Sequence, residues 1–247
     1  MNGTNLFKIA IRALANNKLR AFLTMLGIII GVASVIAMLA IGQGSKRSIQ
    51  KQISKMGSNM IMIHPGGEMR GGVRQDASSM QTLKLENYET LRDECIFLSD
   101  ISPNVSASGQ LIAGANNYPS SVSGVSIGYL NIRQLKIAQG EMFTEEDIRT
   151  AAKVCVIGST IVENLFPDGT DPIGKVIRFS QVPLRVVGVL ESKGYNSMGM
   201  DQDDVVLAPY STVMKRLLAQ TYLSGVFASA ITEDMTDEAV DEISRIL

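Results

Sequence analysis

Residues 21–44 read AFLTMLGIIIGVASVIAMLAIGQG and carry no charged side chain. The apolar part of this run, Ala21 to Ile41, is long enough at about 1.5 Å per helical residue to cross the hydrocarbon core of a bilayer. Two basic residues precede the run, two follow it, and no other stretch of the chain is as long and as apolar. The sequence therefore predicts a single transmembrane helix, over residues 18–44.

A buried helix of a soluble protein and a cleaved signal peptide are the alternatives to this span. A core helix rarely needs such a length without a polar face, and the apolar region of a signal peptide is usually about 7 to 15 residues long. Ala37 and Ala40 stand three apart rather than the two expected of a small-residue cleavage site. The pattern favours an uncleaved anchor.

Basic residues near the ends of the span do not decide its orientation, because four lie before it and four after it. About 200 residues follow the span, and a domain of that size is translocated largely regardless of its charge. We therefore expect a cytoplasmic N-terminus and an extracytoplasmic main domain.

The segments on either side of the span predict two further helices. Residues 5–15, NLFKIAIRALA, place Lys8 and Arg12 four apart on one helical face and apolar side chains on another. This pattern indicates an interfacial helix over residues 1–17 on the cytoplasmic surface, with a polar face that can contact a soluble partner. After the span, the amphipathic run SKRSIQKQISKMG predicts a helical stalk over residues 45–58.

Gly27 and Gly31 form a GxxxG pair inside the span. Small residues at this spacing let two membrane helices approach closely, so the pair predicts a packing face. The alternative is that glycine is simply frequent in membrane helices.

Charge divides the chain into two parts. Residues 1–67 carry eight basic groups and no acidic one, whereas the remainder carries 15 basic and 24 acidic groups. The basic part suits contact with anionic lipid head groups, and the acidic part suits a soluble ectodomain. Nucleic acid is therefore not expected as a partner.

Helix and strand patterns alternate through the ectodomain, which predicts a mixed α/β fold. We expect helices over residues 83–95, 129–135, 160–165, 210–218 and 237–247, and strands over residues 59–63, 96–112, 118–125, 154–157, 175–180, 184–190, 205–208 and 225–231. Cys95 and Cys155 both sit in apolar sequence and are expected to be buried free thiols, although a periplasmic location would permit a disulfide.

Four motifs contain residues that other proteins use in catalysis or in ligand binding, and none of them predicts a catalytic or metal site here. Residues 169–175 match GxxxxGK, but Val176 stands where a phosphate loop needs a hydroxyl, and the stretch leads into a predicted strand rather than a helix. Ser48 and Lys51 have the SxxK spacing without the other elements of that site, and His64 is the only histidine.

The fourth motif is the acidic cluster of Asp201, Asp203 and Asp204, which lacks the spacing of a calcium-binding loop. It is expected to form a solvated or hydrogen-bonded turn. No cofactor and no metal ion are predicted for the chain.

Taken together, several blocks of the chain resemble a MacB-type ABC transporter permease. The blocks are NNKLRAFLTMLGIIIGVASVIAMLAIGQG, GSNMIMIHPG, GEMFTEED, KVCVIGSTIVENLFPDGTDPIGKVIRF, LRVVGVLESKG and DDVVLAPYST. They span nearly the whole chain in the order found in that family, and their combination is far more specific than any one block.

The resemblance implies an α+β architecture. A porter-like periplasmic domain over residues 59–138 and 201–247 would hold a small β-rich inserted domain over residues 139–200. Relatives of this type have three further spans, so the chain, which stops at Leu247, is expected to be a fragment or a truncated form. It is not expected to be an enzyme, because Walker motifs are missing and ATP hydrolysis would belong to a separate ATPase subunit.

The resemblance also implies a role as an export or efflux permease of the bacterial inner membrane. In such proteins the ATPase drives the membrane helices and the outer domain pushes substrate from the periplasmic side, which is called mechanotransmission. The expected partners are the ATPase at Lys8 and Arg12, a second permease copy packed through Gly27 and Gly31, a periplasmic adaptor and an outer-membrane channel.

Two other functions stay open at this point. The first is a membrane-anchored periplasmic sensor or regulatory module that does not transport, and the second is an anchored enzyme, for which no catalytic constellation is present in the sequence. The transported substrate leaves no motif.

Overall fold

The computed structural model describes residues 7–8, 18–55, 59–66, 69–70, 73–74, 81–196 and 199–247. The chain falls into two compact units, Met1–Gln52 and Ile53–Leu247. The second unit holds the mixed α/β fold and is called the head.

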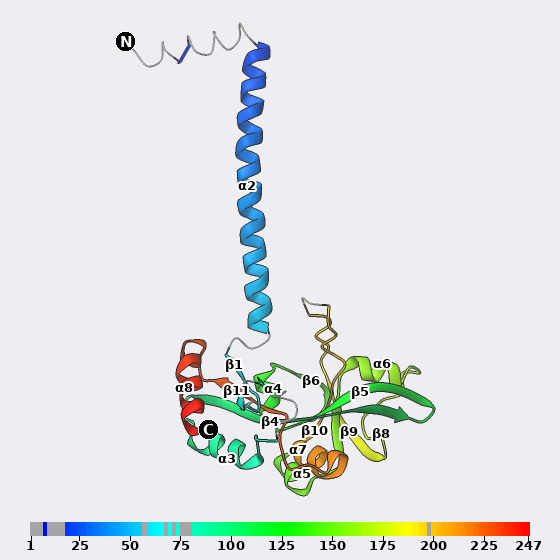
Figure 1. Ribbon diagram of the computed structural model, residues 1–247. Helices are drawn as coiled ribbons and strands as arrows, with labels where there is room; N and C mark the ends of the chain where they lie inside the picture. The colour runs from blue at the N-terminus through cyan, green and yellow to red at the C-terminus, as the bar shows by residue number, and fades with distance from the viewer. Residues whose placement is uncertain are drawn as a thin grey trace. The chain divides into compact units, whose positions relative to one another are not determined.

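Helix α2, Lys18–Lys55, is one continuous helix through the predicted span and most of the predicted stalk (Figure 1). Its part Lys18–Lys46 is long and apolar enough to cross a membrane, and none of that part is buried in the protein. The Thr24 hydroxyl donates a hydrogen bond of 2.9 Å to the Arg20 carbonyl, and Ser34 donates to the Ile30 carbonyl in the same way. Because both hydroxyls are satisfied within the helix, neither opposes transfer into lipid.

Parts of the two flanking predictions lie outside the described residues. Of the interfacial helix over residues 1–17, only residues 7–8 are described, and both are helical and exposed. Of the stalk over residues 45–58, residues 45–55 are helical and residues 56–58 lie outside the description.

In the described residues, nine strands of the head form one hydrogen-bonded sheet in the order β1-β11-β4-β5-β10-β7-β9-β6, with β8 paired to both β4 and β9. The bounds are β1 Met60–Ile63, β4 Leu98–Ala113, β5 Asn116–Val125, β6 Ile137–Gly140, β7 Val154–Ile157, β8 Val176–Phe179, β9 Val182–Leu190, β10 Val206–Pro209 and β11 Gly225–Ala230. The pairs β5·β10 and β7·β9 are parallel, and the other pairs are antiparallel. Two short strands, β2 Met69–Arg70 and β3 Val73–Arg74, form a separate hairpin.

Six of these strands close on themselves, because β8 bridges the ends of the path β4-β5-β10-β7-β9. Each strand of this ring contributes a fully buried side chain to one hydrophobic cluster. These side chains are Leu111, Val122, Ala208, Ile157, Leu184 and Ile177. The ring therefore encloses the main core of the head.

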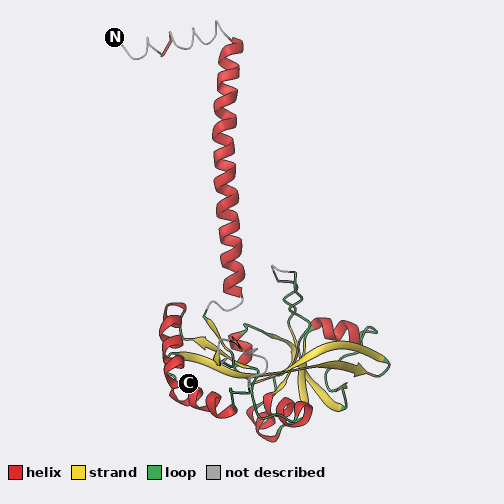
Figure 2. Ribbon diagram, in the orientation of Figure 1, coloured by secondary structure: helices red, strands yellow, loops and turns green. Residues whose placement is uncertain are grey.

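Helices surround the sheet, with α3, α5 and α7 below it and α6 above it in the view of Figures 1 and 2. Their bounds are α3 Leu85–Glu94, α4 Tyr129–Ile132, α5 Glu145–Thr150, α6 Ser159–Leu165, α7 Tyr210–Thr212 and α8 Thr236–Ile246. A π-helix, η2 Val213–Leu218, continues α7, and a 3₁₀ turn, η3 Glu233–Met235, precedes α8.

Every element predicted in the head has a counterpart in the structure, and the predicted strand over residues 154–157 coincides with β7. The elements β2, β3, β6 and α5 were not predicted from the sequence, and α7 and η2 were predicted as one ordinary helix. The strands within residues 139–200 pair directly with β4 and β10 outside that range. The inserted domain with those boundaries stays a prediction.

Candidate functional site

The first and last strands of the head are neighbours in the sheet. β1, which follows α2 in the sequence, pairs antiparallel with β11 from Met60 opposite Ser229 to Ile63 opposite Val226. β11 in turn leads through η3 to α8, the last helix. We call this region, formed by β1, β11, α3 and α8, the junction.

Two hydrogen bonds join Asn59, the residue before β1, to the last residue of β11. The Ala230 N–H donates a hydrogen bond of 2.9 Å to the Asn59 carbonyl, and the Asn59 side-chain amide donates to the Ala230 carbonyl. The two strands are therefore fastened at the end where β1 begins.

Apolar side chains from all four elements of the junction fill the space beside these strands. The cluster consists of Ile61 from β1, Leu91 from α3, Ala228 and Ala230 from β11, and Ala239 and Ile243 from α8. The small alanines let α8 lie close to the sheet, so a displacement of β1 is transmitted to α8 by direct packing.

Glu242 is the buried acid of the junction, with 7% of its surface exposed. One carboxylate oxygen accepts hydrogen bonds from the backbone N–H groups of Ile96 and Phe97, at 3.0 and 3.3 Å. Its other oxygen lies 3.9 Å from the Arg245 guanidinium. The carboxylate therefore links α8 to the segment between α3 and β4 by accepting hydrogen bonds from the backbone N–H groups of that segment.

Cys95 lies beside this carboxylate and is only half-buried, although the sequence predicted a buried thiol. Cys155 is fully buried, as predicted. Burial and the nearby Glu242 raise the pKa of the Cys95 thiol to about 11, and burial alone raises the pKa of the Cys155 thiol. Both cysteines are free. Neither thiol has the thiolate character of a reactive cysteine.

The acidic cluster of residues 201–204 forms a hydrogen-bonded turn. This was one of the two alternatives expected from the sequence, the other being a solvated turn. Asp203 is buried at the base of the loop between β9 and β10 and accepts hydrogen bonds from the Ser192 hydroxyl (2.5 Å), the Lys193 N–H (2.7 Å) and the Gly194 N–H (2.9 Å). Asp201 instead accepts from the Thr160 hydroxyl, and Asp204 accepts from that of Ser120. The three carboxylates therefore have separate partners, and no group of three metal-ligating side chains occurs among the described residues.

Burial opposes the ionisation of Asp203, but the hydrogen bonds from Lys193, Ser192 and Gly194 outweigh it and hold the pKa of Asp203 below its ordinary value. Asp203 is thus a structural anion that closes the base of a loop.

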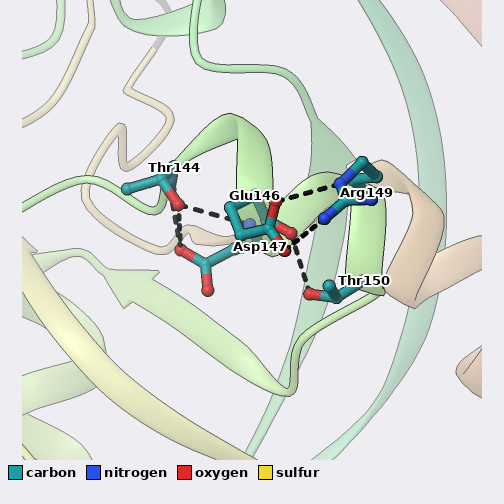
Figure 3. A network of polar contacts seen from close by, with 5 residues as sticks. All are labelled: Thr144, Glu146, Asp147, Arg149 and Thr150. Atoms are coloured by element: carbon teal, nitrogen blue, oxygen red, sulfur yellow. Dashed lines mark hydrogen bonds and ion pairs between the residues drawn. The ribbon is translucent and has the colours of Figure 1, made fainter.

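Helix α5 is short, and side chains within residues 144–150 hold its start and its exposed face (Figure 3). At its start, Thr144 and Asp147 form a reciprocal capping box, with the Thr144 N–H donating to the Asp147 carboxylate at 2.8 Å and the Asp147 N–H to the Thr144 hydroxyl at 3.2 Å. The Arg149 guanidinium donates two hydrogen bonds to the Glu146 carboxylate in a bidentate ion pair, with N···O distances of 2.9 and 2.7 Å.

At the end of α5, three carbonyl groups are bound by side chains of α7 and η2. Ser211 donates to the Ile148 carbonyl, Thr212 donates to that of Ala152 at 2.8 Å, and Arg216 donates to that of Ala151 at 2.8 Å. The position of η2 against α5 is therefore fixed by polar contacts, as well as by the core.

The residues predicted to contact partners belong to the first unit of the chain, Met1–Gln52. Lys8 is exposed, and Arg12 lies outside the described residues. At Gly27 and Gly31 an added Cβ atom would meet no atom of this chain within 4 Å. The packing inside this chain does not require glycine there, and the surface is open to a neighbouring helix.

The motifs set aside in the sequence occupy structural positions. The GxxxxGK stretch lies between α6 and β8, and its Gly174 N–H donates to the Val186 carbonyl at 2.8 Å, so the context is the one predicted and differs from that of a phosphate loop. His64 directly follows β1, and Ser48 and Lys51 lie in α2.

Asn59 and Glu242, the two polar anchors of the junction, were not predicted from the sequence. Glu242 did leave a signal, because it lies beside Ile243 and three residues after Ala239, on the apolar face of an otherwise acidic helix. A buried acid at such a position predicts a specific partner. Asn59 carried no comparable pattern.

Residues 21–246 match the family model of the MacB-like periplasmic core domain. The "Macrolide export ATP-binding/permease protein MacB" of Syntrophobacter fumaroxidans is 40% identical over 240 residues, covering 96% of this chain and 33% of that protein. The protein of the same name from Chlorobaculum tepidum is 36% identical over 238 residues, covering 96% of this chain and 36% of that protein. The chain thus spans about a third of the length of these curated relatives.

Solved structures share the fold of the head. The periplasmic region of MacB from Actinobacillus actinomycetemcomitans superposes with a TM-score of 0.64 at 24% identity, covering 78% of this chain and 86% of that one. The extracellular domain of the noncanonic ABC-type transporter YknZ from Gram-positive bacteria superposes with a TM-score of 0.63 at 17% identity, covering 76% and 92% of the two chains. At these identities the likeness shows the fold alone.

The first prediction concerns the junction. Glu242→Ala is expected to lower the free energy of unfolding by about 2 kcal/mol, because two partly buried N–H groups lose their acceptor. Chemical denaturation followed by tyrosine fluorescence measures the change. The matched control is Asp241→Ala, an exposed acid of the same helix, which is expected to stay within about 0.5 kcal/mol of the unchanged chain. Equal losses in the two variants would contradict the anchoring role.

The second prediction concerns the loop base and its pH dependence. Because the folded-state pKa of Asp203 is lowered, its contribution is present above the unfolded pKa of about 4 and is lost as the pH falls through the folded-state value. At neutral pH, Asp203→Asn is expected to speed amide hydrogen exchange at Lys193 and Gly194 about thirtyfold. Glu191→Gln, in the same loop, is the control expected to leave it unchanged.

In the unchanged chain, protection of these two amides should fall below about pH 4, after correction for the intrinsic exchange rate. The Asn variant should show no such fall. Protection in the unchanged chain that is independent of pH down to full unfolding would count against the clamp.

Proposed function

Because this chain belongs to the family of the MacB-like periplasmic core domain, we propose that it is the permease subunit of an ABC exporter in a bacterial inner membrane. The observation that carries the proposal is the extent of the family match, which runs from the apolar part of α2 to the last turn of α8. A soluble binding domain with this head would not need the apolar helix.

The junction supports mechanotransmission as the working principle. Four residues separate the end of α2 from the start of β1, and β1 is hydrogen-bonded to β11, which leads to α8. The strand that follows α2 in the sequence is therefore the edge of a continuous sheet, and a force on α2 would act on it through these four residues. In the proposed mechanism this force moves the head, and the head pushes substrate that is already on the periplasmic side.

The proposed orientation follows from the size of the domain after the span, and the proposed contacts follow from the basic and small residues of the first unit, Met1–Gln52. The N-terminus lies in the cytoplasm, where Lys8 and Arg12 contact a separate ATPase subunit, and a second copy of the chain packs through Gly27 and Gly31. The names of the relatives combine ATP binding, a permease and macrolide export, which supports an ATPase partner and an exported substrate. A periplasmic adaptor and an outer-membrane channel complete the proposed path.

The third prediction tests the ATPase partner. Affinity purification of the full-length gene product from solubilised membranes is expected to recover an ATPase, with ATP turnover only in the complex. Reversing both charges, with Lys8→Glu and Arg12→Glu, is expected to reduce the recovered ATPase about tenfold, because charge complementarity becomes repulsion.

The matched control is Lys136→Glu with Lys175→Glu, two exposed head lysines that should leave recovery unchanged. Failure to recover an ATPase with any nucleotide would favour the membrane-anchored sensor or regulatory module instead.

The fourth prediction tests the second copy. Gly31→Leu is expected to weaken dimerisation of the full chain in bilayers by at least about tenfold, and to reduce export with it, because the bulky side chain separates the two helices. Single-molecule subunit counting at graded protein-to-lipid ratios measures the dimer. Ile29→Leu, on another face of α2, is the control. Normal dimerisation and export by Gly31→Leu would exclude a packing face at this position.

A further inference from the structure

A cleft of about 370 Å³ opens on the head between the start of α3, helix α5 and the π-helix η2. Its apolar lining comes from Leu85, Ile148, Tyr210 and Met214. The charged residues of the lining are Arg149 and Lys215, both basic. The cleft thus combines an apolar wall with a positive rim.

The walls of this cleft are held in place by contacts that do not depend on a ligand. Ser211, Thr212 and Arg216 bind the last carbonyls of α5, as described above. After η2, the Gln220 N–H donates to the Met214 carbonyl at 3.0 Å, and the Gln220 side chain donates to the Tyr222 carbonyl at 2.9 Å. The cleft is therefore preformed, and its wall includes a π-helix, a rare element that is frequent at functional sites.

The positive charge of the rim is balanced at Arg149 and unbalanced at Lys215. Arg149 is already paired with Glu146 at 2.7 Å, and the neighbouring Arg216 is bound to a carbonyl of α5. Lys215 is exposed and takes part in no ion pair within the described parts of the chain. One cation is thus available to a ligand at the mouth of the cleft.

Acidic groups near the cleft do not line it. Burial, the neighbouring Tyr88 and the carboxylates Glu145 and Glu89 raise the pKa of Tyr210 to about 12, so its hydroxyl stays neutral at physiological pH. Neither carboxylate is part of the lining. The wall therefore offers an aromatic ring with a neutral hydroxyl beside aliphatic side chains.

We propose that this cleft binds a fatty carboxylate, with the alkyl chain between Ile148, Tyr210 and Met214 and the carboxylate at Lys215. The volume lies near the lower end of the range of about 300 to 1,000 Å³ for small-molecule sites, which suits one alkyl chain better than a two-chain lipid. A single available cation matches a head group with one negative charge. The site is independent of transport, and it would bind the same ligand in a regulatory module.

Photocrosslinking of the full chain in lipid nanodiscs tests the proposal. The probe is dodecanoic acid with a diazirine in its chain, and the comparison probe is the dodecylamine with the diazirine at the same position. Labelled peptides are mapped by mass spectrometry and normalised to the label on α2, which reports probe dissolved in the bilayer. The acid is expected to label the segments around Ile148 and Met214 at least fivefold more than the amine.

Two variants test the role of the Lys215 charge and the need for free volume in the cleft. Lys215→Gln is expected to reduce labelling of the cleft by the acid about fivefold, and Lys136→Gln, an exposed lysine outside the cleft, is expected to leave it unchanged. Thr221→Trp, at an exposed lining residue, should block labelling by filling the cleft.

Equal labelling by acid and amine, or unchanged labelling of Lys215→Gln, would overturn the recognition of a carboxylate. Labels spread over the head without enrichment at the cleft would overturn the site.

Discussion

Strand β4 is the constraint on which the rest of the head depends. Its first half pairs with β11 and its second half with β5, so one extended strand of 16 residues belongs to two hydrogen-bonded ladders in succession. Backbone groups in a buried strand must be paired, so a displacement of β4 would break both ladders together. The end of β4 also pairs with β8, which closes the six-stranded ring around the main core. The junction and the ring thus share one continuous hydrogen-bonded sheet.

Two buried carboxylates in the head accept hydrogen bonds from backbone N–H groups. Glu242 accepts from two N–H groups ahead of β4, and Asp203 accepts from two N–H groups and a hydroxyl at the base of a loop. A buried acid is costly unless hydrogen-bond donors surround it. The donors to Glu242 lie 145 and 146 residues away in the sequence, whereas those to Asp203 lie 9 to 11 residues away in the same loop. Each acid therefore holds two parts of the chain in register, which the force transmission proposed above would require.

Local sequence was enough to predict α2 and most elements of the head. The uncharged run of residues 21–44 has one favourable conformation in lipid, a helix, because only a helix satisfies its backbone within the segment. Strands such as β7, Val154–Ile157, were found because a short β-branched run between turns has few alternatives. β6 and α5 were missed because both are short: β6 depends on its pairing with β9, and α5 on its caps and on side chains from α7.

The sequence by itself determined that the chain has one apolar helix, an acidic α/β domain and the motif order of its family. Only the tertiary structure decided which strands are neighbours, that β8 closes the ring, and that Glu242 and Asn59 form the anchors of the junction. The reason is physical. Hydrophobic periodicity and turn residues act over a few positions, whereas Glu242 and its partner Ile96 are 146 residues apart and meet only after the sheet between them has formed.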